Sequence, residues 1–240
     1  RYNPATNTWS AISMANGPSS LSAVVSQWTG SEWIVWGSYG DDPDDATASS
    51  VHYNAGWRSN PSSNSWTAMS RSGAPGPFYT YDSANSPLYG WTGTQLIVFG
   101  GRTFVNNSFG DYSNAGYAYR PASDSWEAFS SSNAPSARGG QSYASHWTGT
   151  ELLFLGGYND NGSLTDGGLY NPATNTWSSV AALPDSVGSI DQDDFVAEGQ
   201  HALLTDYGWH LNCTTRAWTQ LSDVPATNLD YNALAADVQG

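Results

Sequence analysis

The chain contains no lysine, a single cysteine and no long hydrophobic run. Its 240 residues carry 7 arginines against 21 aspartates and glutamates, and the formal net charge is −14. A charge of this sign repels phosphate backbones and anionic lipid headgroups, so it argues against nucleic-acid binding and against binding to an anionic membrane surface. Cys213 alone excludes an intrachain disulfide and any metal site built from several cysteines.

Helical periodicity is missing as well. No segment of ten or more residues repeats its apolar positions at the helical spacing. The longest apolar stretches have only the length of a strand, so no membrane insertion is expected. No signal peptide is visible and the chain begins inside a repeat, from which we expect a processed or truncated piece. The lack of lysine and the wealth of Ser, Thr and Asn favour an extracellular or cell-surface protein.

The chain contains a repeated sequence motif. The sequence Tyr-Asn-Pro-Ala-Thr-Asn-Thr-Trp-Ser stands at Tyr2–Ser10 and again at Tyr170–Ser178, and looser copies end at Trp66, Trp126 and Trp218. The tryptophans of the five copies are 57, 60, 51 and 41 residues apart. This is the range of repeat lengths found in β-propeller blades.

Other markers recur between these tryptophans in a fixed order. Trp-Thr-Gly precedes an apolar strand at Trp28, Trp91 and Trp147, and a glycine pair closes that strand at Gly100-Gly101 and Gly156-Gly157. A weaker copy of the same pattern runs from 197 to 204. The next strand is marked by a glycine that stands five places before the proline of the repeated motif, or before Cys213 in the last copy. Each repeat therefore predicts four antiparallel strands.

These patterns predict an all-β fold with a single domain over residues 1–240, built as a β-propeller that resembles those of the kelch family. The architecture is either four complete four-stranded blades plus one split, incomplete blade, or a fragment of a six- to seven-bladed ring. The expected units span 1–13 (partial), 21–69, 79–129, 142–180, 195–221 and 229–240 (partial).

The family name comes from a resemblance. A diglycine after an apolar strand, then an aromatic residue, then a tryptophan after a short turn resembles the kelch motif. The best match is 136–184, which carries Arg138-Gly139-Gly140, Leu152–Gly157, Tyr170 and Trp177. The resemblance covers essentially the whole chain. It departs from the motif in the first unit, where the diglycine is Gly-Ser, and in the last, where it is Thr-Asp.

The repeated residues are expected to be structural. Glycines at the end of the second strand permit positive φ and close approach of a neighbouring sheet. The tryptophan of the fourth strand is expected to pack against the adjoining blade, which makes Trp9, Trp66, Trp126, Trp177 and Trp218 core residues rather than sugar-stacking platforms. Kelch-type rings are commonly closed by strands from the two termini, and the resemblance implies such a closure here.

Function is expected at one end of the strands. The first-to-second and third-to-fourth turns share an end and are short, whereas the connections of variable length share the other end, where binding residues usually lie. The candidate ligand-binding residues there are aromatic, acidic or cationic: Tyr39, Asp41, Asp42, Asp44, Asp45, Tyr79, Tyr81, Arg102, Phe104, Asp111, Arg138, Tyr158, Asp160, Asp191, Asp193 and Asp194.

The sequence leaves three functions open, the first and third of which use this end. The first is non-catalytic recognition of a protein or a glycan. The second is a structural subunit of an extracellular layer or filament that self-assembles through unpaired strand edges. The third is a carbohydrate-active enzyme that uses loop carboxylates. No cofactor is expected, although Asp160 and Asp166 are candidate calcium ligands without the EF-hand spacing.

Overall fold

The structure is a computed structural model that describes residues 1–18, 25–40, 51–79, 83–106, 108–190 and 194–222. Almost all regular structure in these residues is β, and the helical part is one turn of 3-10 helix, η1 (Ser83–Asn85). No helix among them is long and apolar enough to cross a membrane.

The strands form four antiparallel four-stranded sheets, each with its strands in chain order. Sheet 1 comprises β3 (Val25–Trp28), β4 (Trp33–Gly40), β5 (Val51–Asn60) and β6 (Ser65–Ala68). Sheet 2 comprises β7 (Leu88–Trp91), β8 (Leu96–Phe99), β11 (Gly116–Arg120) and β12 (Ser125–Phe129). Sheet 3 comprises β13 (Gly139–Trp147), β14 (Leu152–Asn159), β16 (Gly167–Asn171) and β17 (Thr176–Val180). Sheet 4 comprises β18 (Phe195–Glu198), β19 (His201–Leu204), β20 (Trp209–Asn212) and β21 (Ala217–Gln220).

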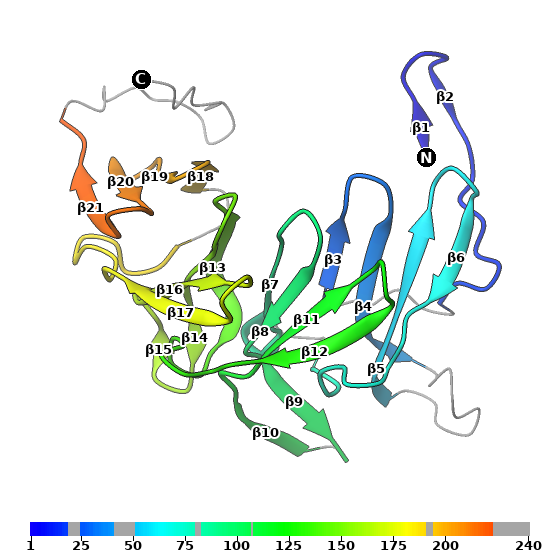
Figure 1. Cartoon of the computed structure of the whole chain (residues 1–240), viewed down its shortest axis with the longest axis horizontal. Helices are drawn as coiled ribbons and strands as arrows, with labels where there is room; N and C mark the ends of the chain where they lie inside the picture. The colour runs from blue at the N-terminus through cyan, green and yellow to red at the C-terminus, as the bar shows by residue number, and fades with distance from the viewer. Residues whose placement is uncertain (19–24, 41–50, 80–82, 107, 191–193, 223–240) are drawn as a thin grey trace.

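Three smaller elements accompany the sheets. The hairpin of β1 (Tyr2–Asn3) and β2 (Thr8–Trp9) precedes sheet 1. A second hairpin, β9 (Arg102–Val105) with β10 (Ser108–Tyr112), is inserted between β8 and β11, and the short β15 (Gly162–Ser163) pairs with β14. Figure 1 shows the four sheets following one another along a curve, with β1–β2 beyond sheet 1 and sheet 4 at the opposite end. In the described part of the chain this row is open and does not close into a ring.

The core lies between consecutive sheets. In β8, Leu96 and Val98 belong to the apolar cluster shared with sheet 1, whereas Ile97 and Phe99 belong to the cluster shared with sheet 3. Strand side chains point alternately to the two faces of a sheet, so a strand that is covered on both faces is apolar at every position. This accounts for the uninterrupted run Leu-Ile-Val-Phe, all four residues of which are fully buried.

The glycines of the repeat permit close approach of backbone and side chains, as expected. Gly100 has φ of 73°, in the left-handed region that favours glycine, and a Cβ there would lie 2.4 Å from the carbonyl oxygen of Arg138. At Gly116 a Cβ would lie 2.0 Å from the ring of Phe129. A larger residue at Gly100 would press on the segment that leads into sheet 3, and one at Gly116 would displace the ring of Phe129, its cross-strand partner on β12.

The repeated tryptophan motif forms hydrogen bonds to the preceding unit of the chain, and we call this arrangement the clamp. The clamp consists of the repeated tryptophan of one sheet and the residue two places before it. These two residues bind the backbone of a residue from the preceding unit, the one that follows the tryptophan of that unit by four places. In sheet 1, Asn64 Oδ1 accepts the backbone N–H of Ser13 at 3.1 Å, and Trp66 Nε1 donates to the carbonyl of Ser13 at 2.8 Å.

The other sheets repeat the clamp with variations. Sheet 3 holds Ser130 through Asn175 and Trp177 at 2.9 and 3.0 Å. In sheet 4, Trp218 Nε1 donates to the carbonyl of Ala181, and the carbonyl of Arg216 accepts the N–H of Ala181, both at 3.0 Å. In sheet 2, Asp124 accepts from Ser70 at 3.0 Å, but Trp126 Nε1 is buried without a partner. The residue two places before each tryptophan has a positive φ: Asn7, Asn64, Asp124, Asn175 and Arg216.

The predicted burial of the tryptophans is confirmed for three of them. Trp66, Trp126 and Trp177 are 4%, 7% and 5% exposed, while Trp218 is partly buried against the cluster between sheets 3 and 4. The prediction is wrong for Trp9, which is 79% exposed. The β1–β2 hairpin corresponds to the third and fourth strands of a sheet, and no other described element covers its clamp.

Candidate functional site: the long-connection end

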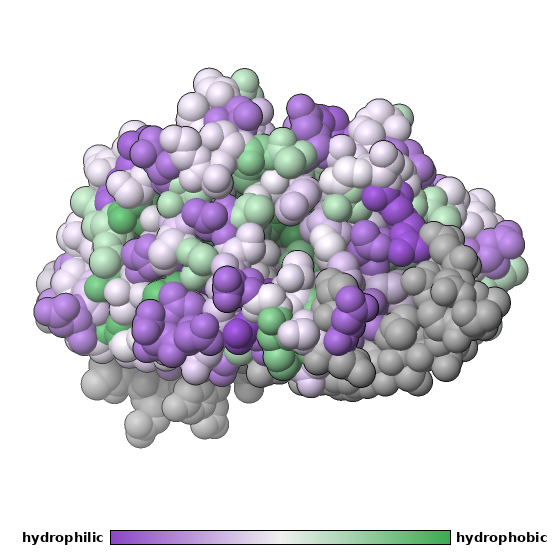
Figure 2. Space-filling view, turned by 90° about the horizontal axis from the view of Figure 1, so that it is seen from below, coloured by the Kyte–Doolittle hydropathy of each residue, from purple (hydrophilic) through white to green (hydrophobic). Residues whose placement is uncertain are grey.

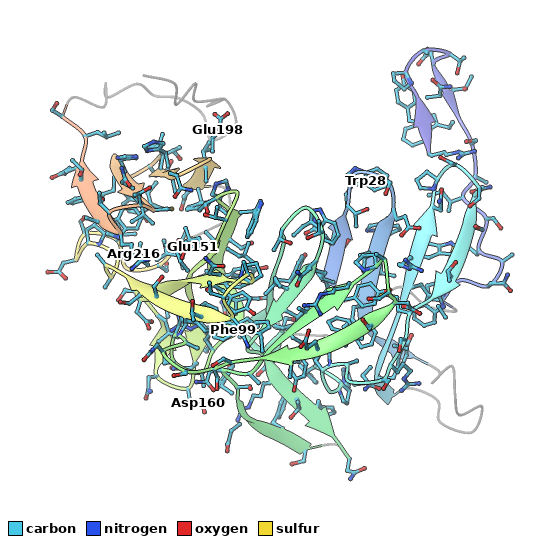
Figure 3. The ribbon with its side chains drawn as sticks, in the orientation of Figure 1. Trp28, Phe99, Glu151, Asp160, Glu198 and Arg216 are labelled. Carbon is cyan, nitrogen blue, oxygen red and sulfur yellow. The ribbon has the colours of Figure 1, made fainter. Side chains whose placement is uncertain are left out.

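Short turns and long connections lie at opposite ends of the strands, as the alternation of antiparallel strands requires. Figure 3 shows Asp160, in the connection after β14, at the lower end, and Trp28 and Glu198, beside short turns, at the upper end. We call the lower end the long-connection end. It is built by the residues between β8 and β11, between β14 and β16, and between successive sheets.

Backbone hydrogen bonds tie these connections to one another. Phe104 N–H donates to the carbonyl of Pro77 at 3.0 Å, and Gly101 N–H donates to the carbonyl of Arg138 at 2.7 Å. Arg138 N–H in turn donates to the carbonyl of Ser113 at 3.1 Å. The connections of sheet 2 are therefore fixed to the chain segments on both sides, which gives their side chains defined positions.

The connection between β8 and β11 contains the β9–β10 hairpin. Its strands pair Phe104 with Phe109 and Val105 with Ser108, with an irregularity before Tyr112. Figure 1 shows this hairpin projecting below the row of sheets. Phe104 and Phe109 face each other across the two strands; neither strand carries a run of alternating apolar residues that predicts it.

Four rings gather where the hairpin meets sheet 1, and we call them the aromatic cluster: His52, Tyr79, Phe104 and Phe109. His52 lies 4.9 Å from Phe104 and 5.0 Å from Tyr79, measured between ring centroids. Phe109 lies 4.8 Å from both Tyr79 and Phe104. Phe109 keeps 44% of its surface exposed. Burial lowers the pKa of His52, and a hydrogen bond with the backbone of Phe78 opposes that shift.

Arg102 flanks the aromatic cluster. Its guanidinium carbon lies 5.2 Å from the Phe109 ring centroid and 4.9 Å from that of Tyr112, within cation–π range. Nε donates to the carbonyl of Gly110 at 2.6 Å, and Nη1 lies 3.3 Å from Asp160 Oδ1. The Asp160 side chain is 71% exposed. Arg102 therefore joins the hairpin of sheet 2 to the connection of sheet 3 and leaves a carboxylate in solvent.

Arg138 has a structural role rather than the ligand-facing one expected from the sequence. It is 0% exposed, and both oxygens of Asp166 accept from its Nη2 at 2.8 Å. Nη1 also donates to the carbonyls of Gly156 and Asp166 at 2.7 and 3.0 Å. Burial lowers the pKa of Arg138, and the bond to Asp166 opposes that shift. The side chain is consumed in holding the connection of sheet 3 to its own first strand.

The calcium candidates meet arginines in this arrangement. Asp166 is paired with Arg138, and Asp160 is paired with Arg102. Among the described residues, no three or more His, Cys, Asp or Glu side chains gather in a way that could hold a metal ion. A calcium ion at this place would have to compete with both guanidinium groups.

The remaining candidates are distributed around the end. Asp111 is exposed on β10, and Tyr158 is half-buried in β14 beside Gly139 and Ser163. The carbonyl of Asp194 accepts the backbone N–H of Thr205 at 2.9 Å. Tyr39 belongs to β4, but its side chain is not described. The other candidates lie outside the described residues: Asp41, Asp42, Asp44, Asp45, Tyr81, Asp191 and Asp193.

The surface of this end is a mixture of polar and apolar areas. Figure 2 views the molecule from below Figure 1, and its described part shows small hydrophobic areas among hydrophilic ones. His52 belongs to the aromatic cluster but was not among the candidates. Nothing in the sequence indicated that His52 of sheet 1 would meet the hairpin that is inserted between β8 and β11.

Four-stranded antiparallel sheets packed face to face along a curve define the fold as propeller-like. Among solved structures, that of YjhT, which has a kelch-like or sialidase-type β-propeller fold, matches with a TM-score of 0.54 and 17% sequence identity. The match covers 84% of this chain and 65% of YjhT, so the chain spans less than two thirds of that protein. At this identity the likeness shows the fold alone. No family model and no curated protein sequence matches the chain.

Proposed function

We propose that the chain belongs to a kelch-type β-propeller and binds another protein, without catalysis, through its long-connection end. The single observation that carries this proposal is the convergence of separate connections on the aromatic cluster and Arg102. An extracellular or cell-surface location fits the composition described above.

The residue types at this end suit a protein partner. Aromatic residues and arginine are enriched among the residues that dominate protein–protein affinity, especially where their positions are fixed before binding. Phe109 offers an exposed ring that is held by Phe104 and Tyr79. Asp160 and Asp111 add exposed negative charge near the ring. With a net charge of −14, the chain favours a partner surface that is basic around an apolar centre.

Selection from a displayed peptide library tests the proposal. Wild-type chain is the bait, and the selected peptides are then measured against Phe109→Ala and Arg102→Ala. We expect each substitution to weaken binding at least tenfold, with enrichment of Lys and Arg around apolar residues. Trp28→Ala is the matched control, because Trp28 is an exposed aromatic residue, 51% exposed, at the opposite end.

The outcomes separate the candidate functions. Peptides that bind wild type and Phe109→Ala equally would refute this site. Binding on a glycan array that is lost in Phe109→Ala would replace the protein ligand with a glycan. The enzyme alternative rests on carboxylates outside the described residues, and hydrolysis of a glycan library that is lost on changing Asp191 and Asp193 to Ala would support it.

A further inference from the structure

The chain contains two asparagine–glycine pairs, Asn16-Gly17 and Asn161-Gly162. In such a pair the backbone nitrogen of the glycine can attack the side-chain amide of the asparagine, because glycine has no side chain that obstructs the approach. Both asparagines are exposed, so water reaches both of them. Any difference in their reactivity therefore depends on how the fold holds each glycine.

The reaction is deamidation, and its only co-reactant is water. The glycine nitrogen loses its proton and forms a bond to Cγ of the asparagine, while the side-chain nitrogen leaves as ammonia and a succinimide ring closes. Water then adds to one of the two ring carbonyls and breaks the C–N bond at that carbonyl. The product is aspartate if the new bond breaks and isoaspartate if the original peptide bond breaks.

The fold holds the glycine of the first pair in place. The N–H of Gly17 donates to the carbonyl of Met14 at 3.0 Å, so the attacking nitrogen is engaged in a turn. A Cβ at Gly17 would lie 2.9 Å from the ring of Trp66, which shows how closely that ring covers the glycine. Attack on Asn16 therefore requires the turn to open and the chain to move away from Trp66.

The second pair lies in the turn between β14 and β15, at the long-connection end. Asp160 and Asn161 form this turn, and Asn159 and Gly162 pair across it. Apart from its chain neighbours, no described atom would lie within 4 Å of a Cβ on Gly162. Because β15 has only two residues, Gly162 is freed when a short ladder opens locally, without unfolding of sheet 3.

We infer that Asn161 is a site of spontaneous deamidation in the folded protein and that the fold protects Asn16. The inference does not depend on the proposed function. The product carries one more negative charge, directly after Asp160, whose Oδ1 lies 3.3 Å from Arg102 Nη1. Figure 3 shows Asp160 at the lower end of the molecule. Deamidation therefore changes the charge of the long-connection end and leaves the opposite end unchanged.

Peptide mass spectrometry of the aged protein tests the inference. The folded chain is incubated in mildly alkaline buffer, where the backbone amide loses its proton more often, and is then cleaved with trypsin. Cleavage after arginine separates the two pairs into peptides 2–58 and 139–216, and fragmentation locates the mass gain from replacement of NH₂ by OH. We expect product at Asn161 to form roughly tenfold faster than at Asn16, the factor expected from a hydrogen bond and a ring contact that must first be broken.

The unfolded chain is the control for the role of the fold. In concentrated urea neither glycine is held, so the two asparagines should react at similar rates. Two variants then assign the charge change of the folded protein, which ion-exchange chromatography follows as the growth of a more acidic form. Asn161→Gln should suppress that form, because a glutamine amide would have to close a larger ring, whereas Asn16→Gln should leave its rate as in wild type.

Four results would overturn the inference. It fails if Asn16 reacts as fast as Asn161 in the folded protein, or if Asn161 stays intact there under conditions in which the unfolded chain has reacted. It also fails if Asn161→Gln accumulates the acidic form as wild type does. A preference for Asn161 that persists undiminished in urea would show that the fold is not its cause.

Discussion

Trp177 and Asn175 hold one residue of the neighbouring sheet by both of its backbone groups. The indole N–H of Trp177 donates to the carbonyl of Ser130 at 3.0 Å, while Asn175 Oδ1 accepts the N–H of Ser130 at 2.9 Å. Asn175 has φ of 55°, a conformation that asparagine adopts more readily than most residues. The geometry explains why the sequence repeats an Asn or Asp two places before a tryptophan.

Substitution of Asn175 tests the energetic value of this joint. Asn175→Ala removes the acceptor and places a Cβ-bearing residue without a polar side chain at positive φ. We expect a loss of about 2–3 kcal/mol in the free energy of unfolding. The lost hydrogen bond and the strain of a Cβ at positive φ each contribute roughly 1–1.5 kcal/mol. Urea denaturation measures it.

Asn175→Gly is the matched control, because glycine accepts the same φ. It should recover the backbone part of the loss and retain the hydrogen-bond part. If the glycine variant were as stable as wild type, the bond to Ser130 would contribute nothing and the clamp would depend on Trp177 alone.

The second prediction concerns the buried ion pair of Arg138 and Asp166. Arg138→Met leaves the carbonyls of Gly156 and Asp166 without their donor and the Asp166 carboxylate without its counter-ion. Removal of one partner of a buried pair costs roughly 3–5 kcal/mol. The Asp166 side chain is 46% exposed, so solvent reduces the expected loss to about 2–3 kcal/mol.

The measurement is the midpoint of urea or thermal unfolding. Asp166→Asn is the companion variant, since it keeps an oxygen acceptor but removes the charge, and we expect a smaller loss. An Arg138→Met variant with wild-type stability would show that the guanidinium only fills space.

The sequence predicted the repeat and its strands because the signals are local. Turn residues such as Asn171-Pro172 and apolar runs such as Leu96–Phe99 fix elements within a few residues of themselves. The fold class followed from counting those elements. Sheets 1, 3 and 4 begin within four residues of the starts of the expected units, whereas sheet 2 begins at Leu88, nine residues after the expected start at 79.

The site was less predictable because its contacts join distant segments. Arg138 is a surface cation by its type, and only the meeting of 136–138 with the connection around Asp166 buries it. The aromatic cluster likewise depends on His52, Tyr79 and Phe104, which come from different sheets or connections. Nothing in the spacing of these residues along the chain indicates that they converge.

The third prediction tests the close packing at Gly116. A Cβ at this position would lie 2.0 Å from the ring of Phe129, so Gly116→Ala forces the ring or the strand to move. The expected cost is about 1–3 kcal/mol, typical of overpacking. In a Phe129→Ala background the ring is gone, and the same glycine substitution should cost much less. Urea unfolding of the four proteins in this cycle measures the coupling; additive losses would contradict the predicted clash.

The fourth prediction concerns stability in mild acid. The pKa values of His52, His146 and His210 are lowered from 6.5, in each case chiefly by burial. A backbone hydrogen bond with Gly199 partly opposes the shift at His146, and the charge of His201 adds to the shift at His210. Just below pH 6.5 the unfolded chain therefore binds more protons than the folded protein.

The sign of the pH dependence follows from that difference. Because the unfolded state takes up more protons, the free energy of unfolding falls as the pH falls. The histidine contribution is complete above pH 6.5 and is lost progressively as the pH drops through the folded-state pKa values. Thermal midpoints measured from neutral pH to mild acid should decline over this range. His146→Gln keeps a side chain able to bond with Gly199 but cannot titrate, so its midpoint should decline less steeply than that of wild type. Equal slopes in the two proteins would show that His146 is protonated as easily in the folded state as in the unfolded chain.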